Sequence, residues 1–102
     1  MTDIEHKAEV FRDLIKDGDK LFDIGKYEES IRYYNNVIVL INNRIEFKSV
    51  VVEAYYHKAK SLAALGEFEA VEACYMEAKE LDPMIEAFYK VLKYSQPQNP
   101  PD

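Results

Sequence analysis

The sequence predicts an all-α protein built from antiparallel helical hairpins, and three observations support this prediction. The chain has three glycines, and its four prolines begin only at Pro83, so the preceding stretch holds few helix breakers. Apolar residues recur through this stretch with the period of an amphipathic helix. A pattern of large and small residues also occurs twice, and the glycines that end its matching segments, Gly25 and Gly66, lie 41 residues apart.

The first predicted helix begins near residue 3. Thr2 and Glu5 have the spacing of a capping box, in which a threonine and a glutamate satisfy free amide groups at a helix start. Gly18 lies inside the helical pattern, where glycine costs about 1 kcal/mol relative to alanine. We therefore expect the backbone of a second helix to approach Gly18 closely. Gly25 is placed to end the first helix.

The second predicted helix begins at Tyr27. The run 37–41 is apolar on every side, so alone it also fits a buried strand. The matching run 78–82 has a helical pattern, and the repeat therefore favours a helix here too. No proline stops this helix, and we expect it to continue for about two turns, to Phe47.

Two further helices complete the repeat. Ser49 is a candidate N-cap for a helix that reaches Leu65 and ends at Gly66. The next helix covers residues 68–81 and stops at Asp82-Pro83, because a residue before proline avoids the helical region. Pro83 suits the first turn of a fifth helix, whose apolar stripe is Ile85, Phe88, Tyr89 and Leu92. Residues 96–102 are polar and proline-rich, which predicts a disordered tail or linker.

Composition excludes several classes of function. The net charge is −6 without a lysine or arginine cluster, which disfavours nucleic acids and anionic membranes as ligands. Cys74 is the single cysteine, so an internal disulfide cannot form. The sequence shows neither a signal peptide nor an apolar run long enough to span a membrane. A cytoplasmic location is therefore expected.

The repeated pattern resembles the tetratricopeptide repeat (TPR). The second copy carries it best, with Ala59, Leu62, Gly66, Phe68, Tyr75, Ala78, Leu81, Asp82 and Pro83. The first copy has Leu14, Gly18, Leu21, Gly25, Tyr27, Tyr34, Val37 and Leu40, but departs from the family at Ser30 and Asn42, which replace the usual alanine and proline. The spacing of 41 residues also exceeds the family period of about 34 residues. Residues 8–41 alone also resemble a three-helix microtubule-interacting-and-transport domain, but the second copy argues against it.

The resemblance implies an α-α superhelix of two repeats, about 11–42 and 52–85, plus a capping helix at 84–95. Together these would form one domain over residues 1–95. It also implies an adaptor or scaffold that binds a peptide or helix of a partner protein. In this family the first helix of each pair lines a concave groove. The groove residues here would be Arg12, Ile15, Asp19, Phe22, Glu53, Tyr56, Lys60, Lys90 and Tyr94; the alternative is that they are ordinary solvated side chains.

Two expectations about the ligand follow from these positions. Phe22 and Tyr56 would serve as apolar anchors, and Arg12, Lys60 and Lys90 would favour an acidic ligand. Some family members clamp the terminal carboxylate of chaperone peptides with a lysine and an asparagine. This chain has Ile15 and Asp19 at those places, so we expect no such clamp.

A second hypothesis is a self-associating structural subunit. Val39 and Ile41 are apolar where the second repeat has Glu80 and Asp82, and apolar residues continue at Ile45 and Phe47. Either the lengthened hairpin covers these four residues, or another copy of the chain does, most simply in a homodimer.

The sequence offers little that favours catalysis. No histidine and cysteine have the spacing of metal ligands, and no nucleophile stands beside a base, so neither an enzyme, a metal nor a cofactor is expected. Glu53 and His57 are four residues apart, which predicts an ion pair along one helix surface. Cys74 is expected to be a buried structural thiol.

Overall fold

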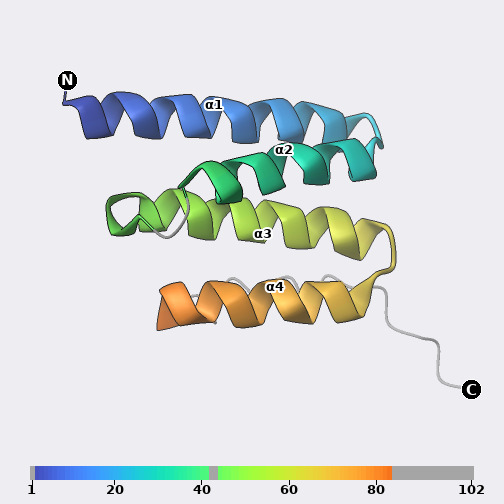
Figure 1. Ribbon diagram of the computed structural model, residues 1–102. Coiled ribbons are helices and arrows are strands. Elements are labelled where there is room, and N and C mark those ends of the chain that lie inside the picture. Colours follow the sequence, from blue (N-terminus) through green and yellow to red (C-terminus); the bar gives the residue numbers. More distant parts are fainter. Residues whose placement is uncertain (1, 42–43, 84–102) are drawn as a thin grey trace, which may run out of the picture.

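The structure is a computed structural model that describes residues 2–41 and 44–83. Its main elements are four α-helices: α1 (Asp3–Asp23), α2 (Tyr27–Ile41), α3 (Lys48–Ala64) and α4 (Phe68–Leu81). They lie side by side in chain order, each antiparallel to the next (Figure 1). Helices α1 and α3 also contact each other directly. The all-α fold of stacked helical hairpins is therefore confirmed, while the capping helix at 84–95 and the tail at 96–102 lie outside the described residues.

Local signals set most of the helix ends. The Thr2 hydroxyl accepts a hydrogen bond of 3.1 Å from the backbone N–H of Glu5, which caps α1 as predicted. Gly25 and Gly66 have φ angles of 81° and 77°, in the left-handed region that glycine reaches at little cost. Both turns carry paired backbone hydrogen bonds that close the helix before them. Asp82 is extended before Pro83 and ends α4 at Leu81, as predicted.

The connection between the repeats differs from the prediction. Helix α2 ends at Ile41 instead of continuing to Phe47, and a short 3₁₀ turn, η1 (Ile45–Phe47), leads directly into α3. Helix α3 begins at Lys48, so Ser49 lies within it and does not cap it. This turn carries Phe47 into the core, where its ring meets the edge of Phe11 with centroids 5.1 Å apart. Burial of a large aromatic side chain explains why the chain turns here.

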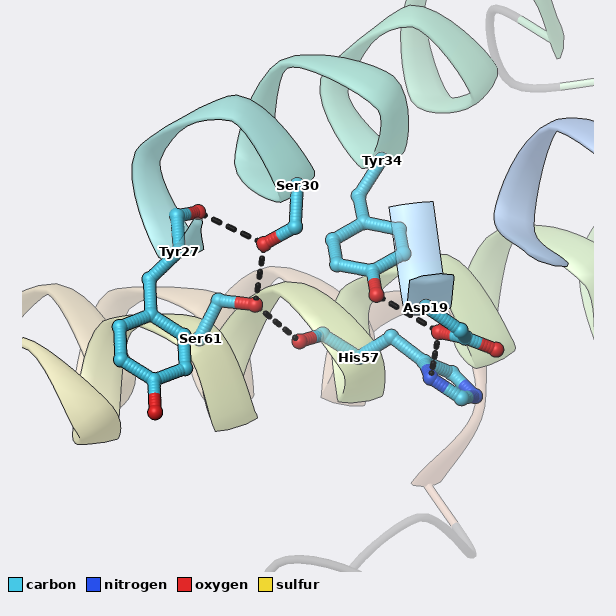
Figure 2. Close-up of polar contacts among 6 residues, drawn as sticks. All are labelled: Asp19, Tyr27, Ser30, Tyr34, His57 and Ser61. Carbon is cyan, nitrogen blue, oxygen red and sulfur yellow. Dashed lines mark hydrogen bonds and ion pairs between the residues drawn. The ribbon is translucent and has the colours of Figure 1, made fainter. Parts of the chain in front are cut away.

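The core runs between the hairpins along one face of each helix. Its buried apolar residues include Ile15, Tyr34, Val37, Ile41, Val50, Ala54, Leu62, Val71 and Ala78. One polar contact lies within it: the hydroxyls of Ser30 on α2 and Ser61 on α3 are 2.8 Å apart (Figure 2). The Ser30 hydroxyl also donates to the backbone carbonyl of Tyr27, and the Ser61 hydroxyl lies 3.3 Å from the backbone carbonyl of His57. The serine that departs from the family's alanine is thus fully hydrogen-bonded, which removes the cost of burying it.

The side chain of Tyr34, and not the backbone of a second helix, explains why residue 18 is a glycine. An added Cβ at Gly18 would lie 2.6 Å from Cε1 of Tyr34, whose ring packs against α1 from α2. The expectation of a close approach is confirmed, but its partner is corrected. A tyrosine ring needs more room across a helix pair than an aliphatic side chain, and only glycine provides it here.

Candidate functional site

Helices α1 and α3 bring together most of the residues predicted to line a groove. Arg12 Nε lies 3.7 Å from Glu53 Oε2, and Lys60 Nζ lies 5.1 Å from the centroid of the Phe22 ring. Between these contacts, Asp19 Oδ1 lies 2.8 Å from Nδ1 of His57. The three contacts occur in the same order along α1 and along α3. We call the surface they form the α1–α3 surface; it comprises Arg12, Asp19, Phe22, Glu53, Tyr56, His57 and Lys60.

One predicted groove residue of the described part of the chain does not lie on this surface. Ile15 is 1% exposed and belongs to the core, so its assignment to the groove was wrong. Helix periodicity places Ile15 on the same side of α1 as Arg12 and Asp19, so its burial comes from the way α1 packs against its neighbouring helices. Lys90 and Tyr94 lie outside the described residues.

The network around Asp19 fixes the centre of the surface (Figure 2). One carboxylate oxygen, Oδ1, accepts a hydrogen bond of 2.6 Å from the Tyr34 hydroxyl and also binds His57. Burial of Tyr34, followed by its contact with Asp19, raises the pKa of this phenol well above its ordinary value. Tyr34 therefore remains a donor, and α1, α2 and α3 are joined at a single oxygen atom.

His57 is the member of the surface that the sequence did not identify. The predicted pair of Glu53 and His57 is not observed, since each of them instead binds a residue of α1. Because Nδ1 lies 2.8 Å from a carboxylate oxygen of Asp19, which can only accept, this nitrogen carries a proton. A signal was present in the sequence: positions 53, 57 and 60 have the i, i+4, i+7 spacing of one helix face.

Two cavities share His57: one is lined by residues of α1, α2 and α3, and the other by residues of α3 and by Asp82. The first, the Asp19 cavity, has a volume of about 230 Å³ and is lined by Asp19, Phe22, Asp23, Tyr34, His57 and Lys60. The second, the Tyr56 cavity, has a volume of about 460 Å³ and is lined by Ser49, Val52, Glu53, Tyr56, His57 and Asp82. Both combine aromatic or aliphatic walls with a few polar groups, which is the usual composition of a binding site.

The residues predicted for self-association separate into two groups. Ile41 and Phe47 are 0% exposed, so they are core residues of a single chain and cannot form an interface; that part of the prediction was wrong. Both belong to the hydrophobic core, where Phe47 packs against Phe11 of α1. Val39 and Ile45 remain 73% and 81% exposed, and Leu40 is exposed beside them.

The described residues show few groups suited to catalysis. Cys74 is buried as predicted, and its burial raises the pKa of the thiol to about 11, so almost no thiolate forms at neutral pH. In residues 2–41 and 44–83 no group of three or more histidine, cysteine or acidic side chains is placed to hold a metal ion. Within the same part of the chain, no helix is both long enough and apolar enough to cross a membrane.

These features define a helical-hairpin repeat protein with a polar and aromatic surface between the first helices of its hairpins. Comparison with family models assigns residues 52–83 to the tetratricopeptide repeat. The chain therefore contains a tetratricopeptide repeat, which covers α3, α4 and the turn between them. No curated protein and no solved structure matches the chain significantly. The family suggests a module for protein–protein interaction and is typically not enzymatic.

Proposed function

We propose that the protein is an adaptor or scaffold that binds a peptide or helix of a partner protein on its α1–α3 surface, without catalysis. The observation that supports this function is that two cavities share His57: one is lined by residues of α1, α2 and α3, and the other by residues of α3 and by Asp82. The aromatic rings of Phe22 and Tyr56 line one cavity each. Aromatic side chains flanked by polar groups are frequent energetic centres of protein interfaces.

The contacts of the described cations do not favour an acidic ligand. Arg12 already faces Glu53, and Lys60 lies over aromatic rings in a cavity that also contains Asp19 and Asp23. Lys90, the third cation behind that expectation, lies outside the described residues. The proposed function therefore rests on the shape and the aromatic groups of the surface, and not on an excess of positive charge.

A Tyr56→Ala variant tests this function. Peptides would first be selected from a random display library on the wild-type protein and mapped by ¹H–¹⁵N NMR. We expect shift changes centred on Phe22, Tyr56 and His57, and a loss of affinity of tenfold or more in the variant, as for an aromatic anchor. Met76→Ala, at an exposed position of α4, is the matched control and should bind normally.

Unchanged affinity in a folded Tyr56→Ala protein would contradict this function. So would selected peptides whose shift changes lie only on α2 and α4. Thermal unfolding of each variant establishes that a loss of binding does not come from a loss of structure.

Self-association is a second candidate function, favoured by the exposure of Val39 and Leu40 near the end of α2 and of Ile45 in η1. Exposed apolar residues mark an interface where they form a contiguous patch. Light scattering over a concentration series should then give a mass near twice 11.9 kDa. A Val39→Lys, Ile45→Lys double variant should restore the monomer, since neither side chain is part of the core. A wild-type protein that stays monomeric at every concentration excludes this candidate.

A further inference from the structure

Lys60 places a positive charge over two aromatic rings of the α1–α3 surface. Its Nζ atom lies 5.1 Å from the centroid of Phe22 on α1 and 5.8 Å from the centroid of Tyr56 on α3. The negative faces of aromatic rings attract a cation at such distances. The chain itself thus supplies a cation to this position, which shows the kind of group that the position accommodates.

Carboxylates outnumber cations around this position. Among the described residues, the Asp19 cavity contains Asp19 and Asp23 against Lys60, and the Tyr56 cavity contains Glu53. Arg12, beside Glu53, is the other cation of the α1–α3 surface. Among the described residues, Asp19, Asp23 and Glu53 against Lys60 and Arg12 leave a formal charge of −1.

The hydrogen-bonding groups of the Asp19 cavity also favour a ligand that donates hydrogen bonds. Oδ1 of Asp19 accepts a hydrogen bond from the Tyr34 hydroxyl and faces Nδ1 of His57, a residue that lines both cavities. The second oxygen of Asp19 and the carboxylate of Asp23 accept as well. A ligand that brings N–H donors and positive charge fits this cavity, whereas a carboxylate ligand would meet like charges.

We propose that the partner segment is basic, and that one of its lysine or arginine side chains enters the Asp19 cavity. Its cation lies over the rings of Phe22 and Tyr56, beside Asp19 and Asp23, and the flexible side chain of Lys60 moves outward. The cavity volume of about 230 Å³ is below the range of drug-sized pockets and suits the end of one side chain. This inference rests on the proposed function, because it names the chemistry of the partner at that same surface.

The test compares two short fluorescein-labelled peptides that differ only in charge: one alternates leucine with arginine, the other leucine with glutamate. Binding is measured by fluorescence anisotropy, and the contacted residues are mapped by ¹H–¹⁵N NMR. We expect the arginine peptide to bind more tightly, with shift changes at Phe22, Asp23 and His57. Its binding should weaken as salt concentration rises, as for partly exposed charges.

A Lys60→Met variant sharpens the test, because methionine keeps most of the apolar stem and removes the competing cation. We expect this variant to bind the arginine peptide about three- to tenfold more tightly, an effect typical of one nearby charge. Asp23→Asn should have the opposite effect. The control is Lys79→Met, since Lys79 also lies over an aromatic ring, Tyr75 on α4, but lines none of the cavities described above.

Each outcome decides between the two proposals. Tighter binding of the glutamate peptide at the α1–α3 surface, weakened by Lys60→Met, overturns the basic partner but leaves the proposed function in place. An equal effect of Lys60→Met and Lys79→Met also overturns the basic partner, because it shows a general effect of net charge. The basic partner is also overturned if the arginine peptide causes shift changes only away from the α1–α3 surface, or if neither peptide binds. The proposed function is overturned if the library-selected peptides cause no shift changes on this surface.

Discussion

Replacement of Phe47 by alanine is expected to lower the free energy of unfolding by about 3–5 kcal/mol. The side chain is fully buried, and its ring packs edge-on against Phe11, so truncation leaves a cavity between η1 and α1. Native domains of this size are stable by only about 5–15 kcal/mol. The variant should therefore unfold at much lower urea concentration, as measured by circular dichroism, or fail to fold at 25 °C.

Ile45→Ala is the control for this prediction. Ile45 belongs to the same 3₁₀ turn, two residues before Phe47, but its side chain is 81% exposed. Its truncation should change the free energy of unfolding by no more than about 0.5 kcal/mol. If both variants lose equally little stability, Phe47 does not occupy the core, and the structure of the turn is incorrect.

The difference between buried and exposed apolar residues near η1 limits how self-association can be tested. A charged residue at Phe47 or Ile41 would remove core packing, so a change in oligomeric mass would then report unfolding and not the loss of an interface. Only exposed positions such as Val39 and Ile45 separate the two effects.

The parts of the fold that were predicted correctly depend on local chemistry. The Thr2 cap, the turns at Gly25 and Gly66 and the stop at Pro83 each act within a few residues, so the sequence specifies them directly. The connection after Ile41 depends instead on tertiary packing. An apolar run indicates burial without indicating which side is covered, and in the structure Ile41 is buried while Val39 is exposed.

The candidate site shows the same division. Helix periodicity placed Glu53, Tyr56 and Lys60 near one another on α3, since these positions share one side of the helix. It could not assign their partners on α1, because the relative rotation of two helices depends on how their side chains interdigitate. For that reason Ile15 was misplaced, and the contact between Asp19 and His57 was missed.

Gly18→Ala is expected to destabilise the protein, although alanine is the better helix former. Helix propensity alone would favour alanine by about 1 kcal/mol. The new methyl group, however, would lie 2.6 Å from the Tyr34 ring. That ring is 1% exposed and its hydroxyl is bound to Asp19, so it has little freedom to move away. Overpacking of this kind costs about 1–3 kcal/mol, so after the gain in helix propensity we expect a net loss of up to about 2 kcal/mol in urea denaturation.

A double-mutant cycle with Tyr34→Leu isolates the clash from other effects of the substitution. Leucine lacks the Cε1 and Cζ atoms, which are the two closest to the added methyl group. In the Tyr34→Leu background, Gly18→Ala should cost much less or become stabilising, which gives a coupling free energy of at least about 1 kcal/mol. The second repeat already shows the compatible combination: it has Ala59 at the matching position, and the matching tyrosine, Tyr75, is only partly buried. Additive effects in the cycle would mean that glycine is required at position 18 for a reason other than the tyrosine ring.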